Sequence, residues 1–250
     1  MRYSLLLDMS VGCAQRGEAQ FVNRGEALVP ELVLWDIDHT LMATRGLGRE
    51  LWEQAFQTVT GIALREQASV TGSTERVILR ETVRLHDIPY SDDLFVRFAD
   101  ALGTLHVRRA AELRERGHAL PGAAAVLASL AERGVAQSVV SGNVRQAAEV
   151  KLAVFGLDSW MRLDEGAYAE DGEGRPELLR AALKRAAVGP QGAVFLGDTP
   201  ADVAGGREAG VRVVAVATGG TSATELRDAG AHAVLDDLAD TGRALAAIGA

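Results

Sequence analysis

The sequence predicts an α/β protein with a doubly wound, Rossmann-like parallel sheet and an inserted all-helical cap. Short apolar runs alternate with helical segments over the second half of the chain, which is typical of strands buried on both faces of a parallel sheet. Residues 48–117 lack such runs and show apolar side chains at helical spacing instead. In addition, polar residues follow directly after three of the predicted strands, where doubly wound sheets bind their ligands.

The N-terminal half divides into a short leading segment, one strand and the cap. Residues 1–30 show no clear period and are interpreted as a poorly ordered or accessory segment. Residues 32–35 form an apolar run that predicts the first strand, at about 32–36. The helical stretch that follows carries stripes such as Leu51, Trp52, Ala55, Phe56 and Val59, which we interpret as core-facing. The expected domains are the core at 31–44 and 119–250 and the cap at 45–118, with hinges near 43–48 and 117–122.

The remaining core elements follow in order after Pro121-Gly122, which opens a helix that stops at Arg133-Gly134. A β-branched run then predicts a strand, and a helix follows it as far as Gly156. Gly210 ends a later helix between two buried strands. The predicted strands lie at 135–140, about 161–168, 193–197, 211–217 and 233–235, and further helices are predicted at 178–187, 202–209 and the C-terminus.

Composition limits the classes of function. The chain has 250 residues, of which 48% are hydrophobic and 24% charged, and its net charge of -8 without a basic stripe argues against a nucleic-acid partner. The single Cys13 leaves no partner for an internal disulfide or a cysteine zinc site. No apolar stretch approaches the roughly 20 residues of a membrane span, and the run at 5–7 is too short for a signal peptide. We therefore expect a cytoplasmic protein without a nucleic-acid or membrane partner.

Three polar clusters are expected to meet at one edge of the sheet. Asp36 and Asp38 follow the apolar run at 32–35, and Ser141 and Asn143 follow the strand at 135–140. The pair Asp198 and Asp202 follows the strand at 193–197 in the same way. Carboxylates near an apolar interior repel one another and lose hydration unless a cation offsets both costs. The sequence thus predicts a metal-assisted reaction centre, although each cluster alone could serve as a turn or a helix cap.

These residues carry a family resemblance. Residues 36–40 (DIDHT), 141–143 (SGN) and 197–202 (GDTPAD) resemble the first, second and fourth motifs of the haloacid dehalogenase-like hydrolase superfamily, in order and over about residues 31–240. The segment from 45 to 119 is similar to the helical cap of phosphoglycolate phosphatases and their relatives, as is the stretch 216–220. The resemblance implies a cytoplasmic, Mg²⁺-dependent enzyme with a small phosphorylated metabolite as its substrate.

The resemblance implies a role for each matching residue. Asp36 would attack phosphorus and become an aspartyl-phosphate, while Asp38 would act as general acid and then general base, a role that favours a pKa raised toward neutrality. Mg²⁺ would bind Asp36, the backbone carbonyl of Asp38 and Asp198, with Asp202 either behind these ligands or linked through water. The residues expected to bind the phosphoryl group are Ser141, Gly142, Asn143, Thr40 and Arg175.

The third motif departs from the family pattern. Many relatives have a lysine before a proline, and here that position is Arg175, followed by Pro176. Lys151, on the helix after Ser141, is the alternative, and either cation could pair with Asp36 and the phosphate. We expect Lys151, because an ammonium is compact, whereas Arg175 could belong to a surface turn.

Asp38 decides among the reactions of the superfamily. Dehalogenases resemble the pattern but lack a second aspartate at this position, because a halide leaving group needs no proton. The sequence therefore favours a phosphatase that hydrolyses a phosphate monoester. Two alternatives stay open, a phosphomutase of the same superfamily and a non-catalytic phospholigand-binding protein. Substrate identity would depend on the cap, where residues 71–76 and Arg80 could reach the substrate or simply begin a helix.

Overall fold

The computed structural model describes residues 29–250, and its centre is a parallel sheet of five strands. The predicted segment 1–30 lies almost wholly outside the described residues. The strand order is β4-β1-β5-β6-β7, so that the first strand of the sequence lies inside the sheet. The strands are β1 (Leu32–Trp35), β4 (Ala136–Val139), β5 (Ala193–Gly197), β6 (Arg212–Val216) and β7 (Ala233–Leu235).

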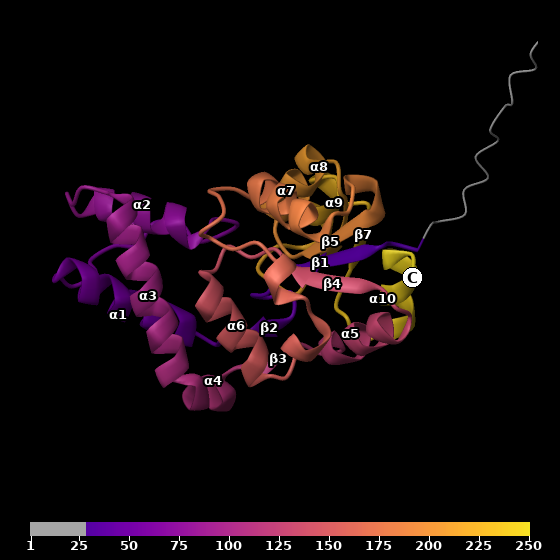
Figure 1. Cartoon of the computed structure of the whole chain (residues 1–250), viewed down its shortest axis with the longest axis horizontal. Coiled ribbons are helices and arrows are strands. Elements are labelled where there is room, and N and C mark those ends of the chain that lie inside the picture. The colour runs from indigo at the N-terminus through magenta and orange to yellow at the C-terminus, as the bar shows by residue number, and fades with distance from the viewer. Residues whose placement is uncertain (1–28) are drawn as a thin grey trace, which may run out of the picture.

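Helices cover both faces of the sheet, as the apolar runs predict (Figure 1). Val33 and Trp35 point into one apolar core, whereas Leu32 and Leu34 point into the other, because side chains alternate along a strand. The first face packs against α5 (Ala123–Glu132), α6 (Arg145–Val154) and α10 (Thr241–Ile248). The second face packs against α7 (Arg175–Ala186), α8 (Pro200–Ala209) and α9 (Ala223–Asp228).

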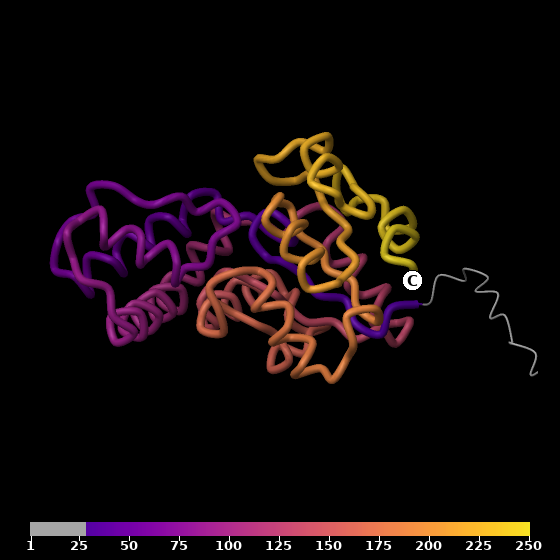
Figure 2. The backbone as a smooth tube through the Cα atoms, turned by 90° about the horizontal axis from the view of Figure 1, so that it is seen from above, coloured from indigo at the N-terminus to yellow at the C-terminus, as the bar shows by residue number. Residues whose placement is uncertain are grey.

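The inserted helical part lies beside the sheet and forms a separate lobe (Figure 2). Its helices are α1 (Leu47–Thr60), α2 (Glu75–Leu85), α3 (Asp92–Arg108) and α4 (Ala110–Arg116). The short strands β2 (Met42–Ala43) and β3 (His118–Ala119) pair antiparallel where the chain enters and leaves this part. Helix α3 packs against both α1 and the core helix α6, which joins the two lobes. The proposed hinges at 43–48 and 117–122 overlap this strand pair.

One predicted element is wrong. Instead of a strand at about 161–168, the chain forms two short 3-10 helices, Asp158–Trp160 and Leu163–Glu165, and a single bridge between Val140 and Ala167. Ala167 still lies beside the end of β4, where its carbonyl accepts a hydrogen bond from Ser141 N–H. None of the helices within residues 29–250 is both long and apolar enough to span a membrane.

Candidate active site

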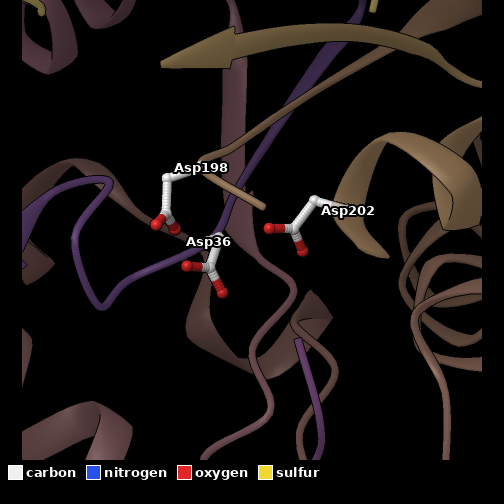
Figure 3. A group of neighbouring side chains, drawn as sticks. All are labelled: Asp36, Asp198 and Asp202. Carbon is white, nitrogen blue, oxygen red and sulfur yellow. The ribbon is translucent and has the colours of Figure 1, made fainter. Parts of the chain in front are cut away.

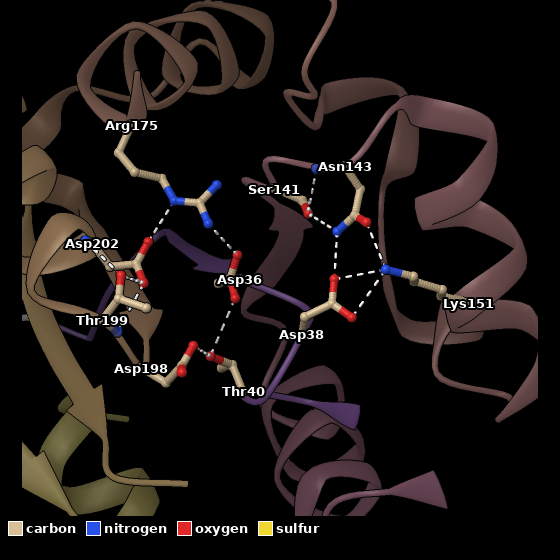
Figure 4. Close-up of polar contacts among 10 residues, drawn as sticks. All are labelled: Asp36, Asp38, Thr40, Ser141, Asn143, Lys151, Arg175, Asp198, Thr199 and Asp202. Atoms are coloured by element: carbon tan, nitrogen blue, oxygen red, sulfur yellow. Dashed lines mark hydrogen bonds and ion pairs between the residues drawn. The ribbon is translucent and has the colours of Figure 1, made fainter. Parts of the chain in front are cut away.

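The three predicted polar clusters meet at the carboxyl edge of the sheet (Figure 4). Asp36 follows β1, and β1 lies between β4, which leads to Ser141, and β5, which leads to Asp198. Parallel strands end at the same edge, so residues far apart in the sequence become neighbours there. Asp36 is 4% exposed and Ser141 is fully buried, which places their polar groups inside the protein.

Three of the acids form a group that could hold a metal ion (Figure 3). Asp36, Asp198 and Asp202 each offer a carboxylate oxygen, and these oxygens lie within 4.8 Å of one another. Burial raises the pKa of Asp36 well above its usual value, although Arg175 opposes this shift. Burial and the nearby Asp202 raise the pKa of Asp198 to about 7. A divalent cation fits this donor set, because it would stabilise the ionised form of carboxylates that otherwise repel one another.

Arg175 binds two of these acids at once. Its Nη2 donates to Asp36 Oδ1 at 2.7 Å, and its Nε donates to Asp202 Oδ1 at 2.5 Å. Arg175 is only 7% exposed, so it does not belong to a surface turn. Its Nη1 is buried and has no hydrogen-bond partner among the described residues. A buried guanidinium N–H without a partner is costly and is therefore available to an anionic ligand.

Lys151 binds Asp38 rather than Asp36. Its Nζ lies 2.7 Å from Asp38 Oδ2 and 2.6 Å from Asn143 Oδ1, and its side chain is 5% exposed. Asn143 Nδ2 in turn donates to Asp38 Oδ2 and to Ser141 Oγ, both at 2.7 Å. The expectation that Lys151 is the cation beside Asp36 is therefore wrong. Helix α6 follows β4 and approaches the site from the Asp38 side, whereas Arg175 starts α7 on the other face of the sheet.

The same network changes the expected ionisation of Asp38. Burial alone would raise its pKa, but the Lys151 ammonium and the Asn143 amide outweigh burial and hold the pKa of Asp38 below its usual value. The predicted shift toward neutrality is thus not found in this arrangement. Asp36 and Asp38 have separate environments with opposite pKa shifts, which is a pattern typical of paired carboxylates with different roles.

The remaining predicted residues support the acids. Thr40 is fully buried, and its hydroxyl lies 3.5 Å from Asp36 Oδ2 and 3.4 Å from Asp198 Oδ1, so it bridges the two carboxylates. Asp202 Oδ2 accepts from the Thr199 N–H and hydroxyl, forming a capping box at the start of α8. Both Asp202 oxygens therefore have protein partners, in agreement with a position behind the direct metal ligands.

Asp198 lies so close to the loop after β6 that only glycine fits at position 219. A Cβ added to Gly219 would lie 1.9 Å from Asp198 Oδ2, far inside van der Waals contact. The absence of a side chain at this position therefore permits Asp198 to face Asp36 and Thr40.

The helical part contacts the core directly at this site. Glu75 N–H donates to Gly142 carbonyl at 2.8 Å, and Glu75 Oε2 accepts from Val144 N–H at 2.5 Å. Burial raises the pKa of Glu75 to about 8, partly offset by Lys151 and by this hydrogen bond. Thr74 caps α2, as the sequence allows, and its hydroxyl also donates to the Glu173 carbonyl.

A cavity of about 590 Å³ lies between the two lobes, and it contains the catalytic candidates. The core contributes Asp36, Asp38, Lys151 and Arg175 to its lining. Two of the lining residues that sequence reasoning missed are Trp52 and His106, which line the cavity from α1 and α3. The available signal was a histidine placed within an otherwise apolar stripe of α3.

Comparisons with known proteins find similar sequences and similar folds. A protein named phosphoglycolate phosphatase from Rhodospirillum rubrum is 28% identical over 221 residues, which cover 86% of this chain and 90% of that protein. A protein of the same name from Nitrosococcus oceani is 25% identical, covering 84% of this chain and 93% of the relative. The crystal structure of a hydrolase from Pseudomonas syringae superposes with a TM-score of 0.66 at 21% identity, covering 87% of this chain and 98% of that structure.

This structural similarity supports the fold. The family model described as haloacid dehalogenase-like hydrolase matches residues 33–216, a span that runs from within β1 to the end of β6 and includes every candidate catalytic residue named above. The chain therefore belongs to the haloacid dehalogenase-like hydrolases.

Proposed function

We propose that the protein is a Mg²⁺-dependent phosphatase that hydrolyses a small phosphate monoester through an aspartyl-phosphate. The observation that carries this proposal is the pair of unequal carboxylates. Asp36 is held between Arg175 and Thr40, while Asp38, two residues away, is bound by Lys151 and Asn143. A nucleophile and a separate proton carrier are the two groups that a two-step hydrolysis requires. The names of the two relatives are consistent with this class of substrate.

In the first step a carboxylate oxygen of Asp36 attacks phosphorus, and the bond between phosphorus and the ester oxygen breaks. Arg175 fixes the orientation of the nucleophile through its bond to Oδ1, and its unpartnered Nη1 donates to a phosphoryl oxygen. The Ser141 hydroxyl and the Gly142 backbone N–H donate hydrogen bonds to the same group. The negatively charged phosphate would raise the pKa of Asp38, so that Asp38 takes up a proton when the substrate binds. Asp38 then gives this proton to the leaving alkoxide.

In the second step water attacks the aspartyl-phosphate, and phosphate leaves Asp36. Asp38 accepts the proton of this water as a general base. Its lowered pKa suits this step, because the carboxylate is then ionised near neutral pH. Lys151 is a positioning residue here, since it holds both oxygens of Asp38 at 3.0 and 2.7 Å.

The proposed metal ligands are Asp36, Asp198 and the backbone carbonyl of Asp38. A bound Mg²⁺ would neutralise charge on the phosphoryl oxygens and lower the cost of bringing an anion to these carboxylates. Asp202 contributes indirectly through Arg175 and Thr199, because both of its oxygens are already bound.

Replacing Asp36 with Asn tests the proposal. The variant keeps the size of the side chain but loses the nucleophile, so we expect 4-nitrophenyl phosphate turnover with MgCl₂ to fall by a factor of about 10³ or more. Circular dichroism and thermal unfolding would establish that the variant is folded. Undiminished phosphate release by the folded variant would contradict the mechanism. A phosphomutase would instead move the phosphoryl group within a sugar phosphate without releasing phosphate.

A further inference from the structure

We propose that the cavity selects a phosphate ester of a hydroxyl-rich, uncharged alcohol, and that Trp52 and His106 recognise hydroxyl groups of this alcohol. This inference rests on the proposed phosphatase activity, which it extends to the leaving group. The two residues come from the helical part, whereas the groups that would act on phosphorus come from the core. Recognition of the alcohol and chemistry on the phosphate are thus divided between the two lobes.

The size of the cavity favours a leaving group larger than glycolate. Its volume of about 590 Å³ falls within the range of sites for small organic ligands, roughly 300–1,000 Å³. The phosphoryl group would occupy the end of the cavity that is lined by Asp36, Gly142 and Arg175. Trp52, Ile78 and His106 line it from the helical part, which leaves room for a leaving group of about the size of a monosaccharide.

Trp52 offers a hydrogen-bond donor without a partner. The indole is 4% exposed and packs against Phe56 and Phe98, with ring centroids 5.8 and 5.1 Å away. Its Nε1–H is buried and makes no hydrogen bond with any described residue. Because an indole N–H can only donate, and a buried donor without an acceptor is costly, this atom requires an acceptor such as a hydroxyl oxygen.

His106 offers the complementary acceptor. Its Nδ1 lies 2.9 Å from the Leu102 carbonyl, which can only accept, so Nδ1 carries the proton. Burial and the nearby Lys151 lower the pKa of His106 to about 4, so the ring is neutral near pH 7. Its Nε2 is therefore an acceptor, and it is buried without a partner in the described chain. A hydroxyl group can accept from the Trp52 N–H or donate to His106 Nε2, and an alcohol with several hydroxyl groups can offer one to each.

The charges around the cavity disfavour a carboxylate on the leaving group. Among the described residues that line the cavity from the helical part, the one cation is Arg49, which is exposed. The two core cations of the lining, Lys151 and Arg175, are already paired, the first with Asp38 and the second with Asp36 and Asp202. A carboxylate on the leaving group would therefore find no unpaired buried cation in the described lining to offset its loss of hydration, whereas a neutral alcohol needs none. The inferred substrate thus differs from phosphoglycolate, the compound in the names of the two relatives.

Steady-state kinetics with matched substrates tests the inference. We would measure kcat/KM with MgCl₂ for glycerol 3-phosphate, ribose 5-phosphate and glucose 6-phosphate, for phosphoglycolate, and for 4-nitrophenyl phosphate as a reference without hydroxyl or carboxylate. For the wild-type protein we expect the best hydroxylated ester to exceed phosphoglycolate. In Trp52→Phe and His106→Phe we expect the ratio of kcat/KM for that ester to kcat/KM for the reference to fall about tenfold, mainly through KM.

The ratio is insensitive to the fraction of folded enzyme, because both substrates report on the same protein. His106→Asn restores an oxygen acceptor and should recover part of the ratio. Trp160→Phe is the matched control, because Trp160 is a partly buried indole that does not line the cavity. An unchanged ratio in both phenylalanine variants, or a wild-type preference for phosphoglycolate, would overturn the inference.

A binding measurement separates this inference from the proposed function. Asp36→Asn should bind substrate without turning it over, so calorimetry with MgCl₂ can compare the same esters at equilibrium. Tighter binding of a hydroxylated ester than of phosphoglycolate supports the inference even if the wild-type protein releases no phosphate, an outcome that would refute only the phosphatase proposal. Equal or weaker binding would overturn the inference even in an active phosphatase.

Discussion

Replacing Arg175 with Met would leave Asp36 and Asp202 without their shared cation. The guanidinium is 7% exposed and binds these carboxylates at 2.7 and 2.5 Å, so solvent cannot replace it readily. Breaking a buried ion pair from one side costs about 3–5 kcal/mol. For a domain of this size each kcal/mol lowers the melting temperature by roughly 2–4 °C, which predicts a loss on the order of 10 °C.

The loss should depend on pH and on Mg²⁺. Without the guanidinium the pKa of Asp36 would rise further above its already raised value, so protonation at low pH would relieve the repulsion. Differential scanning fluorimetry should therefore show a smaller loss at pH 5.5 than at pH 8. Added MgCl₂ should restore part of the melting temperature at pH 8, because the cation would stabilise the same carboxylates.

Arg180→Met is the matched control, because Arg180 lies on the same helix and pairs with Glu208 at the surface, with side chains 53% and 63% exposed. Surface pairs contribute about 0–1 kcal/mol, so this variant should melt within a few degrees of the wild type. Equal destabilisation of the two variants, or the same loss for Arg175→Met at both pH values, would refute the assignment of Arg175 as the buried partner of the two acids.

Two further variants test the contacts around the site. Folding raises the pKa of Glu75 to about 8, so between pH 4.5 and 8 the folded protein retains a proton that the unfolded chain has lost. The wild type should therefore lose unfolding free energy as pH rises through this range, and Glu75→Gln should gain stability relative to it. Urea unfolding at pH 4.5 and 8 measures this, and a pH-independent difference would contradict it. Gly219→Ala would place a Cβ 1.9 Å from Asp198 Oδ2, so we expect the Mg²⁺ concentration at half-maximal activity to rise about tenfold. Gly220→Ala is its control, because the added Cβ meets nothing within 4 Å, and equal effects would refute the role of Gly219.

The sheet and the polar residues at its strand ends could be predicted because both depend on local patterns. Apolar runs buried on both faces specify parallel strands, and Asp36, Ser141 and Asp198 follow such runs directly. The segment 161–168 misled the prediction, because only Ala167 bridges the neighbouring strand while the preceding residues turn into 3-10 helices. A short segment of mixed apolar and polar residues does not by itself distinguish turns from an edge strand.

The partners within the site depend on how helices approach it, which sequence spacing does not specify. Lys151 and Arg175 are both cations near the motifs, but α6 carries the first toward Asp38 and α7 carries the second toward Asp36. The pKa of Asp38 depends in turn on that pairing. The role of His106 could not be predicted for a different reason. A histidine among apolar residues of a helix is typical of a core position, and only the fold places a cavity beside it.

The central claim, that Asp36 becomes phosphorylated during turnover, can be tested by trapping the intermediate. Asp38→Asn removes the proposed base of the second step, so the aspartyl-phosphate should accumulate with 4-nitrophenyl phosphate and MgCl₂. Rapid quenching and borohydride reduction would convert an acyl phosphate at position 36 to homoserine, which peptide mass spectrometry identifies. We predict homoserine at position 36 only when substrate is present. Phosphate release with no homoserine at that position, in either the variant or the wild-type protein, would contradict the account.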